Sequence, residues 1–369
     1  MDFDAAILKN EEKMPFALRS LYARCGYAQF KMSKFEEYEL YLNNKEFLIS
    51  SDIITFTDTN GRLMALKPDV TLSIVRASRP GPGETQKVYY DENVYRISKS
   101  SRSFREIRQV GLECIGAVDD YCIGEVLGLA CRSLQLISPE SRLNLSHLGI
   151  VGDMLDALGL TGGARARALK CIGEKNLHEL EALCRENGAV GEDISRVKRL
   201  LLCSGAPEEV LPALHQLGCG EAAVRQLETL TALLRADGAE GQVCIDFSVL
   251  GDMNYYNGIA FQGYVPGVPA SVISGGQYDK LLGRMGKKGG AIGFACYLDQ
   301  LERLDPGERR ADVDTVLLYD EGADPLHVAE AVRKLQAEGR SVSAQKALPE
   351  RCTYRRALVL TESGVKPLA

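Results

Sequence analysis

The sequence lacks the features that place a protein in a membrane, a secretory route or a repeat architecture. Its 369 residues contain no apolar run near the roughly 20 residues that a membrane-spanning helix requires. The N-terminal stretch MDFDAAILKNEEK is too acidic for a signal peptide. No internal repeat or low-complexity tract is present. We therefore expect a cytoplasmic protein that does not enter a membrane.

Paired cysteines and clustered histidines are also missing. The eleven cysteines are scattered singly from Cys25 to Cys352, without the CxxC pairs of zinc ribbons or dithiol redox centres. Cys131 and Cys296 stand among apolar neighbours, which indicates free, buried thiols in a reducing compartment. We expect no metal site, no cofactor and no histidine-based triad, because no metal motif includes any of the four histidines, His147, His178, His215 and His327.

The chain has no excess of basic residues. Its 44 Lys and Arg are outnumbered by 50 Asp and Glu, which gives a net charge of −6. A dedicated nucleic-acid surface needs clustered lysine and arginine side chains that contact phosphates. The longest basic cluster, GGARARALK at 162–170, is typical of a solvated helix face. The sequence therefore indicates a protein without a nucleic-acid partner.

The sequence contains enough apolar residues to form the cores of more than one globular domain. Hydrophobic residues make up 45% of the chain and charged residues 25%, as in ordinary globular proteins, and the length exceeds the usual size of one domain. Leu-, Ala- and Glu-rich helical periodicity predicts a helical insertion over 160–240, within a core over 1–305. After the charged linker LDPGERRADVD, a strand, helix and strand predict a small α/β unit over 311–369.

The first part of the core reads as a helix followed by hairpins. We expect an amphipathic helix over 5–25 and a strand over 26–32. Asn60-Gly61 accepts the positive φ angles of a tight turn and stands between two β-branched runs, which predicts a hairpin. Two further strands are expected over 87–97 and 104–116. Such a run of hairpins predicts an α+β fold with a largely antiparallel sheet flanked by helices.

The second part of the core mixes helical and strand patterns. We expect helices over 120–137 and 150–160. The segment AIGFACYLDQLERL, residues 291–304, also predicts a helix. Strand patterns return in three segments, 242–250, 254–265 and 270–276.

Four local patterns then appear in a fixed order. They are FTDTNGRLMALKPDVTLSIVRAS, YRISKSSRSFREIRQVGLECIG, the pair DMNYYNGIAFQGY and SGGQYDKLLGRMG, and IGFACYLDQL. In this order they resemble histidyl-tRNA synthetase: its Arg-Pro-Glu-Gly-Thr loop, its motif 2, its two histidine-specific motifs and its motif 3. The family also has a helical insertion at the corresponding place. The resemblance implies a class II aminoacyl-tRNA synthetase-like fold.

The resemblance also implies a site for free histidine. The matching positions are Asp69, Thr71, Arg105, Gln109, Glu113, Tyr255, Tyr256, Gly275, Gly276 and Tyr278. Asp69, Gln109 and Glu113 match the residues that accept from the α-ammonium. Arg105 matches the motif 2 arginine, whose planar fork suits a carboxylate. The three tyrosines match the walls of the amino-acid pocket, and the two glycines let the backbone approach closely.

A structural interpretation of these residues stays open. Gln109 and Glu113 can form the polar face of a strand, because positions i and i+4 of a strand share one face. Core packing is the ordinary role of the tyrosines. The combination with Asp69 and Arg105 favours histidine binding.

Residues that serve the synthetase reaction have changed. Adenylate formation requires positive charge against the transferring and leaving phosphates. The family's Arg-Gly-Leu-Asp-Tyr-Tyr reads GDMNYY here, which places Gly251 at the arginine. The Glu-Arg that closes motif 3 is Asp299-Gln300, and Phe-Arg-x-Glu in motif 2 is YRIS, with Ser98 at the glutamate. The resemblance therefore implies a binding site without the chemistry.

This combination resembles the histidyl-tRNA synthetase paralogues that serve as regulatory subunits of ATP phosphoribosyltransferase. The resemblance implies a non-catalytic chain that assembles with a short-form catalytic subunit and binds L-histidine as the feedback inhibitor of histidine biosynthesis. A self-dimer within the hetero-oligomer is also implied, although motif 1 has Ser33 in place of its proline and keeps Glu36. Two alternatives stay open: an active histidyl-tRNA synthetase, and an amino-acid-binding module for another partner. Inhibitory histidine can occupy the synthetase-like pocket or a subunit interface.

Overall fold

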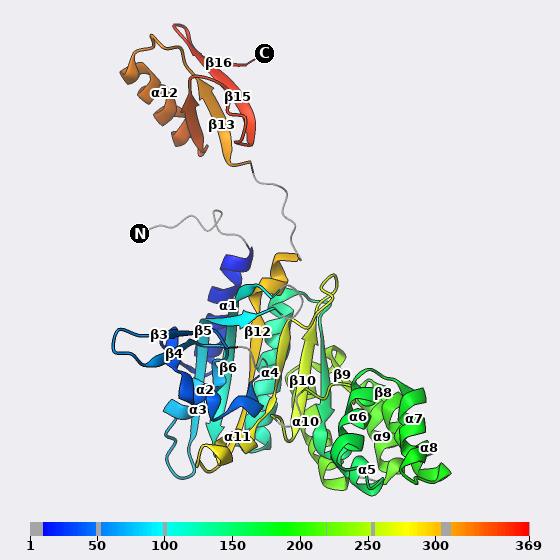
Figure 1. Ribbon diagram of the computed structural model, residues 1–369. Helices are drawn as coiled ribbons and strands as arrows, with labels where there is room; N and C mark the ends of the chain where they lie inside the picture. The colour runs from blue at the N-terminus through cyan, green and yellow to red at the C-terminus, as the bar shows by residue number, and fades with distance from the viewer. Residues whose placement is uncertain are drawn as a thin grey trace. The chain divides into compact units, whose positions relative to one another are not determined.

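A computed structural model describes residues 10–48, 53–98, 102–218, 220–251, 255–303 and 311–368. The chain divides into two compact units, Met1–Leu304 and Asp305–Ala369. The first contains a large sheet with most of the helices, and the second contains a small sheet with one described helix (Figure 1). No helix within the described ranges has the length and apolar character needed to cross a membrane.

A nine-stranded sheet forms the centre of the first unit. Its neighbouring strands are antiparallel except for two parallel pairs, β1 with β5 and β7 with β9. The predicted antiparallel sheet is therefore confirmed. In spatial order the strands are β1 (Ala28–Gln29), β5 (Thr85–Ile97), β6 (Phe104–Gly116), β12 (Gly290–Tyr297), β11 (Ile273–Gln277), β10 (Ile259–Tyr264), β7 (Arg142–His147), β9 (Val243–Asp246) and β8 (Ser204–Gly205).

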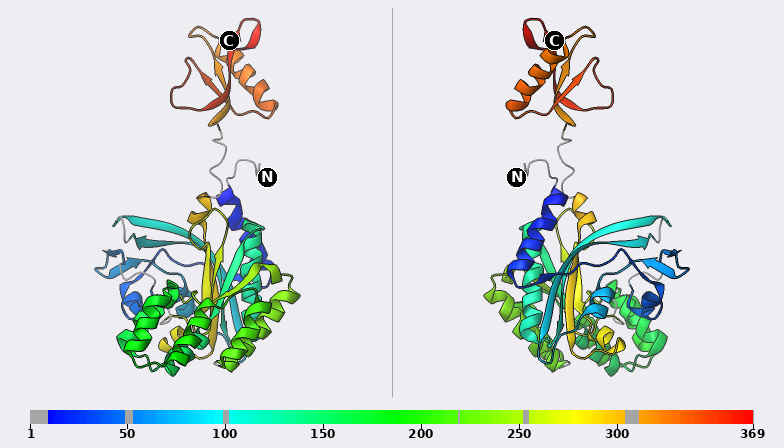
Figure 2. Two further views of the ribbon diagram at one scale, coloured as in Figure 1. Left: turned by 90° about the vertical axis from the view of Figure 1, so that its right-hand side faces the viewer. Right: turned by 90° about the vertical axis from the view of Figure 1, so that its left-hand side faces the viewer.

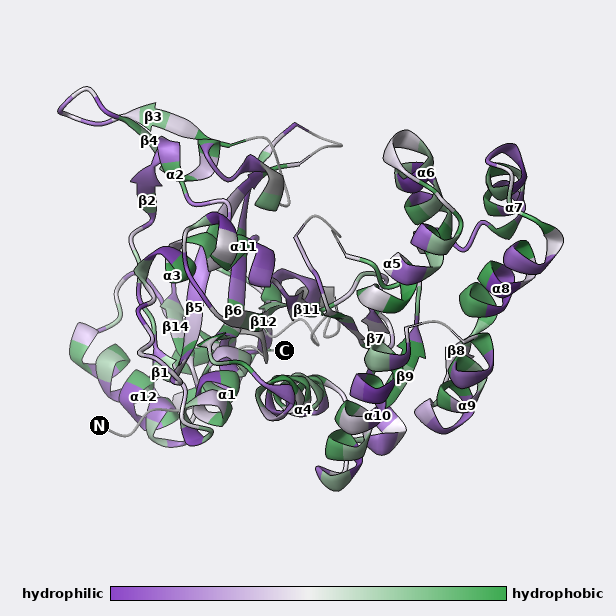
Figure 3. Ribbon diagram, turned by 90° about the horizontal axis from the view of Figure 1, so that it is seen from below, coloured by the Kyte–Doolittle hydropathy of each residue, from purple (hydrophilic) through white to green (hydrophobic). Residues whose placement is uncertain are grey.

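Helices cover both faces of this sheet. On one face α1 (Asn10–Arg24) and α4 (Asp120–Ile137) pack against the strands, with α10 (Glu221–Ala236) beside α4. On the other face lie α3 (Thr71–Ala77) and α11 (Asp279–Arg284) (Figure 3). The helices predicted over 5–25 and 120–137 are confirmed, except that residues 5–9 lie outside the described ranges.

The predicted Asn-Gly hairpin is also confirmed. It joins β3 (Thr55–Thr57) to β4 (Leu63–Leu66), and Gly61 has a φ of 80°. The Asp58 carboxylate fixes the turn by accepting from the amides of Asn60 and Arg62, at 2.8 Å each. A third short strand, β2 (Phe35–Glu37), completes this sheet and leads into α2 (Tyr38–Leu42) and a 3-10 turn, Lys45–Phe47. The hairpin lies beside the free end of β5 and β6 (Figure 2).

A group of amphipathic helices lies between β7 and β9. Their buried leucines and valines belong to the main apolar core, which includes Leu183 of α7 and Leu200 of α8. The helical periodicity predicted for this stretch is confirmed. Strand β7 was not predicted from the sequence. The helices are α5 (Leu148–Ala157), α6 (Gly162–Gly173), α7 (Leu177–Glu186), α8 (Gly191–Leu202), α9 (Pro207–Leu217) and α10.

The helix predicted over 291–304 is wrong. Residues Gly290–Tyr297 form β12 and Leu298–Arg303 form a 3-10 turn. β12 lies near the middle of the sheet and is buried on both faces, so its residues form a continuous apolar run that resembles a buried helix in sequence. Gly293 of this strand pairs with Glu113 of β6.

The second unit has its own small core. Its sheet has the order β14 (Val342–Gln345), β13 (Val313–Leu318), β15 (Tyr354–Thr361), β16 (Gly364–Pro367). Helix α12 (Pro325–Ala337) packs on it through Ala331 and Leu335, against Leu317 and Leu360. The strand, helix and strand predicted from the sequence are confirmed, with β14 and β16 in addition.

The cysteine prediction can be checked at most positions. All cysteines in the described ranges carry free thiols, and Cys131 and Cys296 are fully buried, as predicted. Four others, Cys25, Cys203, Cys244 and Cys352, are partly buried, and Cys219 lies outside the described residues.

Gly293 provides a test of how tightly β12 packs on β6. A Cβ atom at this position would overlap Glu113 Oε2 and the Leu112 carbonyl oxygen. We expect Gly293→Ala to lower the free energy of unfolding by about 3 kcal/mol, the upper part of the range for overpacked cores. Urea denaturation followed by circular dichroism measures this change. Gly283→Ala is the control, because no atom lies within 4 Å of its Cβ; equal stabilities of the two variants would contradict the expectation.

Candidate functional site

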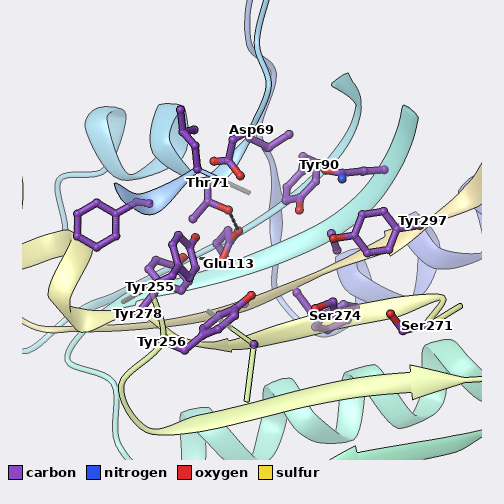
Figure 4. Close-up of a pocket in the computed structure, with 18 of the residues that line it drawn as sticks. Asp69, Thr71, Tyr90, Glu113, Tyr255, Tyr256, Ser271, Ser274, Tyr278 and Tyr297 are labelled. Carbon is purple, nitrogen blue, oxygen red and sulfur yellow. Dashed lines mark hydrogen bonds between the residues drawn. The ribbon is translucent and has the colours of Figure 1, made fainter. Parts of the chain in front are cut away.

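A cavity of about 390 Å³ lies on the face of the sheet that carries α3 and α11. Strands β5, β6, β10, β11 and β12 contribute to it, together with the segments before α3 and α11 (Figure 4). Its lining residues are Phe47, Leu48, Asp69, Val70, Thr71, Tyr90, Arg96, Gln109, Glu113, Gly251, Tyr255, Tyr256, Gln262, Ser271, Ser274, Tyr278, Gly293, Phe294, Ala295 and Tyr297.

Glu113 lies deep in this cavity, with 2% of its surface exposed. Thr71 Oγ1 donates to Glu113 Oε1 at 2.8 Å, and the Tyr278 hydroxyl donates to Oε2 at 2.5 Å. Burial raises the pKa of Glu113 to about 8, although both hydrogen bonds favour the ionised form. The nearby Asp69 carboxyl adds to the rise. Neither hydroxyl carries a positive charge, so these two hydrogen bonds do not neutralise the negative charge of an ionised Glu113.

Asp69 lies at the start of α3, and a lysine holds the other end of that helix. Asp69 Oδ1 accepts from the Leu72 amide at 2.9 Å, as a helix-capping carboxylate does. Burial raises the pKa of Asp69, and the Leu72 amide and the Arg96 guanidinium oppose the rise. At the C-terminal end, Lys287 Nζ donates to the carbonyl oxygens of Arg76 and Ser78 at 3.0 and 2.7 Å. Both contacts fix α3 and therefore the position of its first residues in the cavity.

Aromatic rings form one wall of the cavity. The Tyr255 ring packs against Tyr256 with centroids 4.7 Å apart and against Tyr278 at 5.6 Å. Burial raises the pKa of all three hydroxyls, which keeps them neutral. Figure 4 shows these rings on one side of Glu113, with Tyr90 and Tyr297 on the other. Such a wall suits a flat, polar ring, because the tyrosine rings can pack on its face and their hydroxyls can form hydrogen bonds with its edge.

The cavity also has an unused donor and a cation. Gln109 is 3% exposed, and its Nε2 has no hydrogen-bond partner among the described residues. A buried amide without a partner is costly, so a ligand atom is the natural partner for it. Arg96 contributes the guanidinium of the lining, and its Nε donates to the Pro68 carbonyl oxygen at 3.0 Å.

The structure brings seven of the ten predicted residues together. Those that line the cavity are Asp69, Thr71, Gln109, Glu113, Tyr255, Tyr256 and Tyr278. Arg105 is on β6 but does not line the cavity. Its side chain is 55% exposed and approaches Asp299 at 3.9 Å. This placement does not support the expectation that Arg105 meets a ligand carboxylate in the cavity.

Gly275 and Gly276 serve packing between protein atoms. A Cβ atom on Gly275 would overlap the Gly293 carbonyl oxygen and lie 2.6 Å from Phe261 Cζ. One on Gly276 would lie 2.7 Å from Tyr256 Cδ1. Both glycines therefore let β11 fit between its neighbours, and Gly276 gives Tyr256 its place beside the cavity.

Several lining residues escaped the sequence analysis. Arg96 lies in the YRIS segment, in which Ser98 was identified as a changed position. The same motif could therefore have identified Arg96. Tyr90 lies on the same strand, an even number of residues before Arg96, and strand alternation places the two on one face. Gly111 makes room for Tyr90, because a Cβ there would overlap its hydroxyl. The other missed polar residues, without a distinctive pattern, are Gln262, Ser271, Ser274 and Tyr297.

The positions of the missing synthetase chemistry offer no replacement charge. Gly251 has a φ of 56°, and a Cβ there would lie 2.6 Å from the Tyr256 ring, so a side chain would be strained and crowded. Gln300 donates to Asp299 Oδ2 at 3.0 Å, and the Ser98 amide donates to the Ser103 carbonyl oxygen at 2.9 Å. The described residues form no cluster suited to a metal ion. Chemically, the cavity can bind a small charged molecule but offers little for three phosphates.

The Glu113 carboxyl predicts a pH-dependent stability. Its pKa is about 8 in the folded chain and near the ordinary value of about 4.3 in an unfolded chain. The folded state binds this proton more tightly, so the contribution of Glu113 to stability is lost as pH rises through 8. Glu113→Gln stays neutral, and we expect its stability relative to the native chain to increase between about pH 5 and about pH 9.

Chemical denaturation of both chains at several pH values measures this difference. Leu112→Val, a buried change beside Glu113 that adds no titrating group, should alter stability by a constant amount. A difference between Glu113→Gln and the native chain that is also constant would contradict the expectation.

The chain resembles known proteins in sequence. Residues 2–301 match the family model described as histidyl-tRNA synthetase. A protein named ATP phosphoribosyltransferase regulatory subunit from Desulfitobacterium hafniense strain Y51 is 30% identical over 293 residues, which cover 77% of this chain and 75% of that protein.

Two solved structures have a similar fold. One, from Bacillus halodurans C, is named as an ATP phosphoribosyltransferase regulatory subunit/histidyl-tRNA synthetase. It has a TM-score of 0.73 and 25% identity, over 91% of this chain and 88% of that one. A chain of an ATP phosphoribosyl transferase complex from Thermotoga maritima has a TM-score of 0.63 and 22% identity, over 78% and 97% of the two chains.

These comparisons confirm the predicted α+β fold of the class II aminoacyl-tRNA synthetase type. They also agree with the resemblance derived from the four motifs. The chain therefore belongs to the histidyl-tRNA synthetase family and, within it, to the ATP phosphoribosyltransferase regulatory subunits.

Proposed function

We propose that this chain is the regulatory subunit of an ATP phosphoribosyltransferase, required by a short-form catalytic subunit and responsible for feedback control by histidine. Its relatives carry the name of that subunit, and a protein with the same fold occurs in a complex named for the enzyme. The observation that carries the proposal for histidine is the cavity, in which two buried carboxyl groups, an amide nitrogen without a partner among the described residues, and a tyrosine wall converge.

Histidine has the groups that this cavity lacks. Its α-ammonium would lie near Asp69 and Glu113 and favour the ionised form of these buried carboxyl groups, with charge-assisted hydrogen bonds worth about 1.5–3 kcal/mol. Its imidazole would pack on the tyrosine wall, whose neutral hydroxyls can donate to or accept from the ring nitrogens. Feedback then requires that histidine bind one state of the complex more tightly, and a coupling of about 1–3 kcal/mol is sufficient.

We further propose that the chain does not activate histidine. Adenylate formation needs cations against the α-phosphate and the leaving pyrophosphate. Gly251 offers no side chain, and Gln300 is neutral and bonded to Asp299. Arg96 is the one cation of the lining within the described residues.

The remaining parts of the proposal concern assembly and organisation. The chain would form a hetero-oligomer with the catalytic subunit, with a self-dimer within it, in the cytoplasm and without a nucleic-acid or membrane partner. Histidine would bind in the core, 1–305. We assign residues 160–240 as an insertion in that core and 311–369 as a truncated C-terminal unit.

Reconstitution tests the regulatory role. The chain is mixed with a short-form ATP phosphoribosyltransferase catalytic subunit, and phosphoribosyl transfer to ATP is measured with and without histidine. We expect the chain to raise the rate and histidine to lower it. Glu113→Ala should raise the inhibitory histidine concentration by about 10- to 100-fold, because the ammonium loses a charge-assisted partner.

Glu106→Ala, an exposed change on the same strand, is the control and should leave inhibition unchanged. A thermal melt verifies that both variants fold. A rate that does not respond to the chain would sink the regulatory role. Inhibition that is unaffected in folded Glu113→Ala would place the inhibitory histidine at another site, such as a subunit interface.

Histidine-dependent exchange between ATP and pyrophosphate tests the loss of chemistry. We expect the purified chain to show no exchange above a blank without protein, because Arg96 is the one cation that lines the cavity among the described residues. An active histidyl-tRNA synthetase measured in parallel is the positive control. Exchange by this chain would establish it as an active synthetase and overturn the non-catalytic assignment.

A further inference from the structure

We infer that Lys287 is a positioning residue for the ligand cavity, although it does not line it. Its side chain ties the end of α3 to the end of α11, so that the two hydroxyls that donate to Glu113 are held in place before a ligand binds. The inference rests on the proposed function, which supplies histidine as the ligand. It adds a residue outside the cavity on which the affinity for histidine depends.

Two short helices begin at Glu113. Thr71, the first residue of α3, donates to Glu113 Oε1 at 2.8 Å, and Tyr278, directly before α11, donates to Oε2 at 2.5 Å. The helices have seven and six residues. Helices of this length leave most of their terminal backbone groups unpaired and are unstable alone. Their positions therefore depend on contacts with the rest of the protein at both ends.

The backbone of Lys287 belongs to the end of α11. Its amide donates to the Leu282 carbonyl oxygen at 2.9 Å, and the Gly286 amide donates to the Gly283 carbonyl oxygen at 3.1 Å. Gly286 has a φ of 69°. This is the Schellman arrangement, in which a left-handed glycine closes the helix. The origin of the Lys287 side chain is therefore fixed relative to α11.

The side chain of Lys287 reaches the end of α3. Its Nζ donates to the carbonyl oxygens of Arg76 and Ser78 at 3.0 and 2.7 Å, and also to that of Val75. An ammonium has three donors, and the C-terminal end of a helix carries partial negative charge. Glu113, α3, Lys287 and α11 thus form a closed ring of contacts, in which neither helix can shift without breaking a hydrogen bond.

Arg79 makes similar contacts without joining two elements. Its Nη1 donates to the carbonyl oxygens of Arg76 and Ser78 at 2.6 and 2.7 Å. These bonds connect α3 only to the chain that directly follows it, so they cap the helix and leave α11 aside. Loss of Arg79 removes a cation from the end of α3, whereas loss of Lys287 removes a cation and the link to α11.

The apolar side of α3 explains why the link affects the site more than the fold. Leu72 and Ile74 are buried in the core beneath the helix and hold it on the sheet in either case. Without Lys287, a smaller fraction of chains has Thr71 and Tyr278 assembled around Glu113. The apparent affinity for a ligand falls by that fraction, because the ligand must stabilise the assembled site.

Calorimetry of the full chain with L-histidine tests this inference. We expect Lys287→Met to weaken histidine binding by about 5- to 20-fold. Lys287→Arg should restore most of the affinity, because it has donors for the same carbonyl oxygens. Arg79→Met should weaken binding less than Lys287→Met does, and Lys288→Met, a change in the exposed neighbour, should bind like the native chain.

Hydrogen exchange of α3 provides a second measurement. The amides of Ile74 and Ser78 donate to the carbonyl oxygens of Val70 and Ile74 at 3.1 and 2.8 Å. We expect these amides to exchange faster in Lys287→Met than in the native chain, and to regain native protection at saturating histidine. Should the Met variant not fold in a thermal melt, Lys287→Gln, which keeps a neutral donor, is measured in its place with the same expected directions.

The outcomes separate this inference from the proposed function. Native affinity in the folded Lys287 variant, or equal weakening by Lys287→Met and Arg79→Met, would overturn the link between the helices. If Glu113→Ala still weakens histidine binding in that case, the proposed site stays intact. A native chain that binds no histidine, with or without the catalytic subunit, would overturn both.

Discussion

A carboxyl group buried in the middle of a sheet determines the arrangement of the site. Glu113 has 2% of its surface exposed, and its oxygens are reached by hydroxyls from two distant segments. The opposite strand must have glycine at 293, because any side chain there would overlap the carboxyl. α3 must begin where Thr71 can reach it, and the turn before α11 must present Tyr278. The strands, the glycine and the helix starts are thus all fitted to one charge-bearing group.

Local patterns were enough to predict much of the fold. The strand pattern over 104–116, the Asn-Gly turn at Gly61 and the helical period over 120–137 each depend on neighbouring residues, and the strand, the turn and the helix are all confirmed. The segment 291–304 failed because burial on both faces removes alternation, and only its position in the sheet distinguishes it from a buried helix.

Many residues of the candidate site were predictable from the sequence, but which of them reach the cavity was not. The motifs named residues that converge on one cavity, although they come from segments far apart in the chain. Strand alternation gives the face of a residue and not its distance along the strand, so Arg105 could not be distinguished from Arg96. That difference depends on the β5–β6 register and on the backbone at Pro68, neither of which a local pattern contains.

The long β5–β6 hairpin has a consequence for the order of folding. Its strands are separated by a short connection, so they can pair early at little loop-closure cost. Thr71 and Tyr278, in contrast, are 42 and 165 residues from Glu113 in sequence. The β5–β6 pair, which carries Glu113, can therefore form while a ribosome is still extending the chain. The part of the cavity lining that includes Tyr278 requires almost the whole core. A ligand of this cavity would recognise only chains that have completed that assembly.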